Sequence, residues 1–199
     1  LMTLENKQMD QTLLQNAIFV GEVIYGTKKY SGSKYSLYES TLNFKWDFNF
    51  PNDLKSKQVS MAYIIVVNEK IYKIGQSSGK GGIKSCMSFY LNAGTDDPGP
   101  NRFMINYLMR EELAKGSKIN IYMIYMEPIK VNVPSLSGCK EILVPVSAKG
   151  IEQNCLDDYK KHYEGKNPSW NFQENAITCP DHIAILFAQS REKRASKPM

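Results

Sequence analysis

The feature that most constrains the fold is a predicted pair of short strands. Apolar and β-branched residues dominate Ser60 to Val67, Asn68 and Glu69 supply a polar turn signal, and the apolar pattern resumes from Lys70 to Ile74. Two such runs around a short turn are typical of an antiparallel β-hairpin. The sheet is therefore expected to be antiparallel, unlike the parallel sheets in which a strand leads through a loop into a helix.

Helical periodicity marks further segments. We expect an amphipathic helix within the first 20 residues, a helix over residues 83–91, and a helix over residues 102–115 that ends at Gly116. Ser147 can cap a last helix, in which Glu152 lies beside an apolar stripe formed by Ile151, Cys155, Leu156 and Tyr159.

The remaining segments are a strand and loops. Alternation and β-branching predict a strand over residues 118–127, followed by a loop that contains Pro and Gly, and residues 21–58 are expected to be irregular or short strands. The order hairpin, helix, helix, strand, helix predicts an α+β fold, with a small antiparallel sheet flanked by helices.

Length and composition are typical of one folded unit with additions. Of 199 residues, 42% are hydrophobic and 23% charged, as in ordinary globular proteins. The apolar runs are too short to span a membrane and the first residues carry no export signal, so we expect no membrane partner and a location in the bacterial cytosol. Cys86, Cys139, Cys155 and Cys179 form no C-x-x-C pair, which favours reduced thiols over disulfides or a zinc site.

A basic and aromatic stretch near the N-terminus is a candidate nucleic-acid contact. Lys28, Lys29 and Lys34 are interleaved with tyrosines, and no acidic residue falls among them. Cations that contact phosphates and rings that stack on bases suit nucleic-acid binding, and the net charge of +5 permits it. A solvated turn whose tyrosines pack on the core is the alternative interpretation.

The glycine-rich loop from Gly75 to Gly82 does not match a phosphate-binding P-loop. That pattern is G-x-x-x-x-G-K-[ST], whereas GQSSGKG is one residue shorter and has Gly81 in place of the magnesium-binding hydroxyl. The strand that enters the loop also belongs to a hairpin. Nucleotide hydrolysis is not expected, and we interpret the glycines as a flexible connection.

Polar residues of the hairpin predict a catalytic site. Tyr63 and Lys73 are equally distant from a turn centre near Asn68, so their side chains are expected to face each other. An ammonium beside a phenol lowers the phenol pKa, and the resulting phenolate can act as a general base. Lys84 adds a cation for a phosphate, and Glu152 adds a carboxylate suited to a hard divalent metal such as Mg²⁺.

These residues carry a resemblance to the GIY-YIG nuclease superfamily, and most of all to its compact type II restriction endonucleases. The matching elements are AYIIVV, YKIG, a basic residue nine positions after Gly75 and a glutamate in a distant helix, and they cover roughly residues 60–173. The resemblance implies that Tyr63 is the base for the attacking water, that Lys73 replaces the tyrosine of YIG, and that Glu152 binds a single Mg²⁺ ion. Asn171 matches a late polar position.

Two positions depart from the family pattern. The GIY element is MAY, which keeps only the tyrosine, and Lys84 stands where the family has an arginine that stabilises the phosphate. Lysine keeps the charge but loses the planar fork of the guanidinium. A natural replacement, compensation by Arg102, or an engineered change made to trap a substrate complex would each account for it. The engineered change is favoured because Leu1 precedes the first methionine, and it predicts low cleavage activity.

The sequence therefore predicts a sequence-specific, Mg²⁺-dependent endonuclease that acts on double-stranded DNA as a homodimer, since a two-fold protein matches a palindromic site. Residues 60–175 would form the nuclease core, 1–59 an extension for DNA recognition or dimerisation, and 176–199 a C-terminal extension with a basic tail. Gln76 would contact the phosphate or its water, and Lys80, Arg102 and Asn171 would join the N-terminal lysines as DNA contacts.

Two alternatives stay open. The chain could be a catalytically silent DNA-binding module on the same fold, or a repair or homing nuclease of the same superfamily. Each site residue taken singly also has an ordinary structural explanation, such as a half-buried strand tyrosine at Tyr63 or a surface lysine at Lys73.

Overall fold

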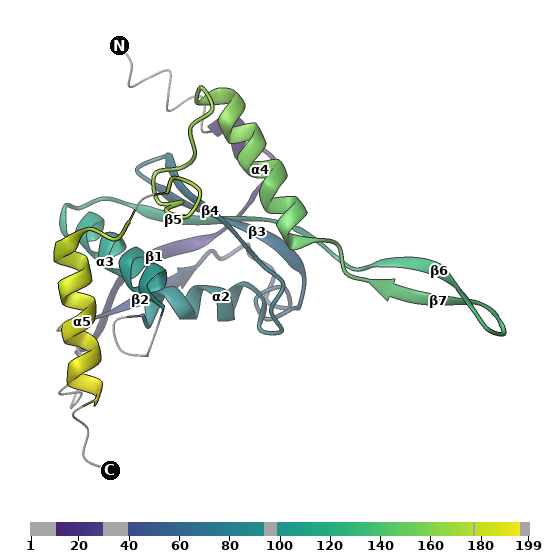
Figure 1. The fold of residues 1–199 in the computed structure, drawn as a ribbon, viewed down its shortest axis with the longest axis horizontal. Helices are drawn as coiled ribbons and strands as arrows, with labels where there is room; N and C mark the ends of the chain where they lie inside the picture. The colour runs from purple at the N-terminus through teal and green to yellow at the C-terminus, as the bar shows by residue number, and fades with distance from the viewer. Residues whose placement is uncertain (1–10, 30–39, 94–98, 177, 196–199) are drawn as a thin grey trace.

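The chain folds into a five-stranded antiparallel sheet with helices on both faces (Figure 1). The structure is a computed structural model that describes residues 11–29, 40–93, 99–176 and 178–195. From one edge to the other, the strands are β2 (Ser40–Trp46), β1 (Ile18–Lys29), β5 (Ile119–Met126), β3 (Ser60–Val67) and β4 (Lys70–Ser77). Every neighbouring pair is antiparallel, so the predicted α+β class and the predicted hairpin are confirmed.

Helices cover the two faces of the sheet. α2 (Gly82–Leu91) and α3 (Pro100–Ala114) lie on one side and α4 (Ala148–His162) on the other, as Figure 1 shows. α5 (Asp181–Ala195) packs against α3. The predicted helices over residues 83–91 and 102–115 and the one that follows Ser147 are confirmed, and the Ser147 side chain accepts a hydrogen bond from the N–H of Gly150 as an N-cap.

β3 lies between two hydrophobic cores. All eight of its residues are buried. The side chains of Tyr63 and Ile65 belong to the core shared with α2 and α3, whereas Ile64 and Val66 belong to the core shared with α4. A strand covered on both faces needs apolar residues at every position, which explains why this segment is a continuous apolar run.

The N-terminal part differs from the prediction. Only residues 11–13 of its described part are helical, and Ile18, which was expected in the helix, begins β1. Residues 21–58, expected to be irregular or short strands, contain most of the twelve-residue β1 and all of the seven-residue β2. Both strands pair within the same sheet as β3 and β4, so this part of residues 1–59 is continuous with the sheet of residues 60–175.

The expected loop after β5 is a second hairpin. β6 (Ile129–Ser135) and β7 (Gly138–Val144) pair antiparallel as a separate two-stranded sheet that projects from the body of the molecule (Figure 1). Two of the residues that suggested a loop belong to these strands: Pro134 is the second-to-last residue of β6, and Gly138 is the first residue of β7. No helix in the described part of the chain has the length and apolarity needed to cross a membrane.

Candidate active site

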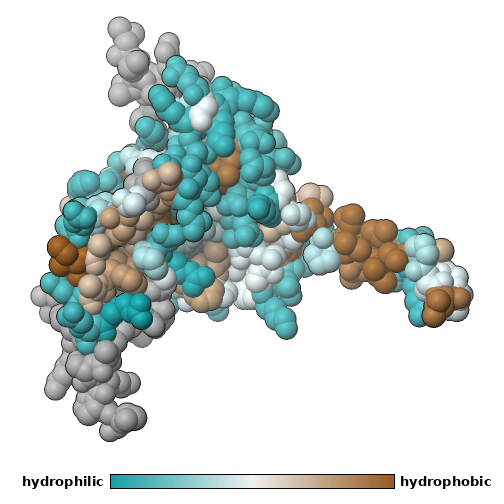
Figure 2. All heavy atoms as spheres, in the orientation of Figure 1, coloured by the Kyte–Doolittle hydropathy of each residue, from teal (hydrophilic) through white to brown (hydrophobic). Residues whose placement is uncertain are grey.

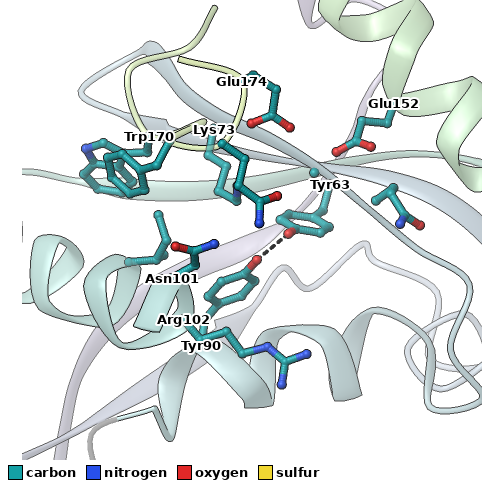
Figure 3. Close-up of a pocket in the computed structure, with 13 residues that line it drawn as sticks. Tyr63, Lys73, Tyr90, Asn101, Arg102, Glu152, Trp170 and Glu174 are labelled. Atoms are coloured by element: carbon teal, nitrogen blue, oxygen red, sulfur yellow. Dashed lines mark hydrogen bonds between the residues drawn. The ribbon is translucent and has the colours of Figure 1, made fainter. Parts of the chain in front are cut away.

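A cleft opens at the β4 edge of the sheet, where the β3–β4 hairpin meets α2, α3, α4 and the loop after α4 (Figure 3). Its volume is about 390 Å³. Tyr63 reaches it from β3, Lys73 and Gln76 from β4, Arg102 from α3 and Glu152 from α4. The structure therefore brings together five of the residues that the sequence singled out, although they are spread over 90 positions of the chain.

A β-bulge in β4 decides which side chains of the hairpin enter the cleft. Ile65 pairs with Lys73, but the next residue, Val66, pairs with Ile71, so Tyr72 is an extra residue on β4. One extra residue moves every following side chain to the opposite face of a strand. The bulge therefore turns Lys73 toward the face covered by α2 and α3 instead of the face covered by α4.

The predicted pairing of Tyr63 directly opposite Lys73 is wrong. Tyr63 pairs with Gly75, and Lys73 is its diagonal neighbour, two residues earlier on β4. The prediction centred the turn on Asn68, whereas Val67 pairs with Lys70 across a two-residue turn, and it also missed the bulge; each error shifts the pairing by one residue. Tyr63 and Lys73 nevertheless line the same cleft, because the bulge places both side chains on one face of the sheet.

Gly75 is required by the position of the Tyr63 ring. A Cβ atom at residue 75 would lie 2.3 Å from the Tyr63 hydroxyl oxygen and 2.4 Å from its Cζ, far inside van der Waals contact. The ring thus lies directly over the Gly75 backbone. From the sequence, this glycine is expected to belong to a flexible connection, whereas in the structure it is the residue that admits the phenol to the cleft.

Tyr90 is a site residue within the helix predicted over residues 83–91, where its spacing from Ile83 and Met87 indicates a core position. It comes from α2, and its hydroxyl is hydrogen-bonded to the hydroxyl of Tyr63 (Figure 3). The two ring centroids are 5.8 Å apart. A tyrosine within the apolar stripe of a helix has a polar tip that needs a partner, and this was the signal available in the sequence.

Burial dominates the pKa values of both phenols. It raises the pKa of Tyr63 well above the usual value, and the neighbouring Tyr90 and Cys86 raise it further. Burial also raises the pKa of Tyr90, to about 12, although the hydrogen bond with Tyr63 lowers it. The expected lowering of the Tyr63 pKa by Lys73 is therefore not found, because desolvation of the phenolate outweighs any such contribution.

Burial and neighbouring charges both shift the pKa values of Lys73 and Glu152. Burial lowers the pKa of Lys73, while Glu174 and then Glu152 raise it. Burial raises the pKa of Glu152, and Glu174 adds to this effect, while Lys73 and Lys149 counteract it. The cleft thus holds one ammonium within electrostatic reach of two carboxylates.

Arg102, and not Lys84, supplies the cleft with its second cation. The Lys84 side chain is exposed on α2 and is absent from the cleft lining, and its backbone N–H donates to the carbonyl of Lys55 at 2.9 Å. Arg102 lines the cleft, and its guanidinium carbon lies 4.4 Å from the centroid of the Phe89 ring. This cation–π contact places the guanidinium over the exposed Phe89 ring.

The other predicted DNA contacts lie away from the cleft or outside the described residues. Lys80 is exposed in the loop before α2. Lys28 and Lys29 end β1, and their side chains, like all of Lys34, lie outside the described part. Asn171 is fully buried, and its amide bonds to the backbone of Ile74.

The oxygen ligands that face the cleft suit a hard divalent cation. Glu152 is half-buried, and Figure 3 shows its carboxylate and that of Glu174 directed into the cleft. Mg²⁺ is commonly held by one or two carboxylates and keeps several waters. Within the described ranges, no group of three or more His, Cys, Asp or Glu side chains is placed to hold a metal.

Comparison with known proteins gives no family assignment. No protein-family model matches the chain, and no curated protein is significantly similar. Among solved structures, a mutant of bacteriophage T4 EndoII is 17% identical over 83% of this chain and 97% of its own, with a TM-score of 0.45. Restriction endonuclease HPY188I in complex with product DNA is 16% identical over 80% of this chain and 82% of its own, with a TM-score of 0.42. At these values the likeness assigns no function, which has to be argued from the cleft.

Proposed function

We propose that the chain is a Mg²⁺-dependent DNA endonuclease of the restriction type with a GIY-YIG-like active site. The observation that supports this proposal is the convergence of Tyr63, Lys73, Arg102 and Glu152 on one cleft. The phenol can serve as a base and the ammonium as a positioning cation. The guanidinium can bind a phosphate, and the carboxylate can bind a metal ion. Hydrolysis of a phosphodiester uses all four of these functions.

Tyr63 is the proposed general base for the attacking water. Because burial holds its pKa well above the usual value, the phenol is protonated at neutral pH until positive charge enters the cleft. Once Tyr63 has lost its proton, the hydroxyl of Tyr90 can donate a hydrogen bond to the phenolate oxygen. Tyr90 thereby stabilises the reactive form of the base.

Glu152 is the proposed metal ligand and Arg102 the proposed phosphate ligand. A divalent ion on Glu152 would supply positive charge to the departing 3′ oxygen. Arg102 can bind two phosphate oxygens at once through its planar fork, as a lysine cannot. Of the three explanations for Lys84, compensation by Arg102 is the one that the lining of the cleft favours.

The test is cleavage of a long DNA duplex with and without Mg²⁺. We expect cuts at defined sites with Mg²⁺, and loss of cutting with retained DNA binding in Tyr63→Phe and Glu152→Ala. Glu164→Ala, which removes a strongly exposed carboxylate outside the cleft, serves as the control. Cleavage that survives both Tyr63→Phe and Glu152→Ala would refute the proposal.

A catalytically silent DNA-binding module is the second candidate. The raised pKa of Tyr63 and the lysine at position 84 favour it. It predicts that the chain binds duplex DNA and never cuts it, with any divalent metal. Divalent-dependent cutting of the duplex by the unmodified chain distinguishes the endonuclease from this candidate.

The remaining parts of the proposal concern assembly and recognition. A homodimer in the bacterial cytosol would place one cleft on each strand of a palindromic duplex site. Lys28, Lys29 and Lys34 would contribute to reading that site. Replacing all three by alanine should weaken the sequence preference, measured by sequencing the cut ends, while phosphate binding is retained.

A further inference from the structure

We propose that Glu174 is a positioning residue that holds the Lys73 ammonium in the cleft, an inference that rests on the proposed function. No motif in the sequence marks Glu174, which lies in the loop after α4. It lines the same cleft as Lys73 and Glu152, and Figure 3 shows its carboxylate directed into that cleft.

The loop that carries this carboxylate is fixed to the two residues that flank Lys73 on β4. The N–H of Trp170 donates to the carbonyl of Tyr72 at 2.7 Å. The amide of Asn171 accepts from the N–H of Ile74 at 2.9 Å and donates to its carbonyl at 2.8 Å. The loop therefore follows β4, and any shift of the strand around Lys73 moves the loop with it.

Hydrogen bonds within the loop fix its shape next to the carboxylate. The N–H of Asn175 donates to the carbonyl of Asn171 at 3.0 Å, and its side-chain amide donates to the carbonyl of Pro168 at 2.9 Å. The side chain of Asn167 donates to the carbonyl of Glu174 itself at 3.2 Å. These bonds fix the backbone that carries Glu174, an exposed residue whose side chain lines the cleft.

The charge balance of the cleft gives Glu174 a role that Glu152 cannot fill. Of the two carboxylates, Glu174 acts more strongly on the Lys73 ammonium. A divalent ion on Glu152 would occupy that carboxylate and would also repel the ammonium. Glu174 then remains as the carboxylate that keeps Lys73 beside Tyr63.

The experiment compares Glu174→Gln with Glu164→Gln, which neutralises an exposed carboxylate outside the cleft. With duplex DNA, we expect Glu174→Gln to lower kcat about tenfold, as loss of a supporting partner commonly does, with the Mg²⁺ requirement unchanged. In a Lys73→Ala background the same change should cost nothing further, since its effect passes through Lys73. Glu174→Asp should restore part of the rate.

A second measurement needs neither DNA nor metal. Acylation of the Lys73 amine by an N-hydroxysuccinimide ester, followed by peptide mass spectrometry, should be about two- to fivefold faster in Glu174→Gln, because the nearby charge that raises the pKa of Lys73 is removed. Glu164→Gln should label like the wild type. This result stands even if the chain proves not to cut DNA, so failure of the proposed function and failure of this inference can be told apart.

Three outcomes would overturn the assignment of Glu174. One is labelling of Lys73 in Glu174→Gln at the wild-type rate. Another is a loss of kcat that is undiminished in the Lys73→Ala background. The third is a raised Mg²⁺ requirement with unchanged labelling, which would make Glu174 a metal ligand instead.

Discussion

Two hairpins of similar length have opposite surroundings in this molecule. β3 and β4 contain eight residues each, and all of β3 is buried. β6 and β7 contain seven each, and their residues are exposed or only partly buried. Figure 2 shows hydrophobic surface along the projecting β6–β7 hairpin, where Ile129, Leu136, Ile142 and Leu143 are exposed.

The difference lies in tertiary contacts and not in the hairpins themselves. β3 pairs with β5 and packs against α4, whereas the described contacts of β6 and β7 are chiefly with each other. A two-stranded hairpin alone is only marginally stable in water. Substitutions should therefore be tolerated well in the β6–β7 hairpin and poorly in the β3–β4 hairpin.

The largest contrast is expected from removing an isoleucine side chain. Ile65→Ala on β3 should lower the free energy of unfolding by about 2–5 kcal/mol, because Ile65 is fully buried. Ile142→Ala on β7 should cost about 0.5 kcal/mol, because Ile142 is 44% exposed. Urea unfolding of both variants measures the two values. Equal losses would show that the two hairpins are equally constrained.

A contrast of cations tests the catalytic use of the buried hairpin. Arg102→Ala should lower kcat about 10²- to 10³-fold, as loss of one ligand to developing charge does in other enzymes. Arg102→Lys should lie between this variant and the wild type, and Lys84→Ala should cut at the wild-type rate. Single-turnover cleavage with Mg²⁺ is the measurement. A higher rate in Lys84→Arg would instead support the engineered replacement.

A contrast of glycines tests how closely the hairpin is packed. Gly75→Ala should cost about 1–3 kcal/mol of stability and displace the Tyr63 ring, because its Cβ has no room beside the phenol. Gly79→Ala, in the loop that follows β4, meets only the Ser77 hydroxyl at 3.7 Å and should be neutral. Thermal unfolding of both variants measures the change in stability, and cleavage assays measure the effect of displacing the Tyr63 ring. Wild-type activity in Gly75→Ala would contradict the ring position.

The smallest effect is expected at the tip of the projecting hairpin. Leu136 is fully exposed between β6 and β7, so Leu136→Ser should change the free energy of unfolding by less than about 0.5 kcal/mol. Denaturant titration at several protein concentrations measures this. A larger loss, or one that depends on concentration, would mean that another surface covers the side chain in solution.

Elements with strong periodicity could be predicted from the sequence, and so could the residues that such elements carry. The β3–β4 hairpin, α2, α3, β5 and α4 are confirmed, and Tyr63, Lys73 and Glu152 do share a cleft. The length of β1 could not be predicted, and its segment was expected to be irregular or short strands, because glycine, glutamate and threonine interrupt its apolar pattern and neighbouring strands decide its state.

Details of the site that depend on distant contacts could not be predicted. Tyr72, the extra residue of the bulge, accepts a hydrogen bond through its carbonyl from the N–H of Trp170, nearly 100 residues later in the chain. The spacing of Tyr90 in its helix indicates an ordinary core residue, because only the folded structure brings its hydroxyl to that of Tyr63. Glu174 lines the cleft from a loop that is hydrogen-bonded to β4, and no local sequence pattern indicates this contact.

The paired bonds between Asn171 and Ile74 have one more consequence. β4 is an edge strand, and edge strands with free N–H and C=O groups invite pairing with another chain. The amide of Asn171 uses both backbone groups of Ile74, as one residue of a neighbouring strand would. Together with the Trp170 N–H on the Tyr72 carbonyl, this side chain occupies backbone groups in the middle of β4 that an added strand would need.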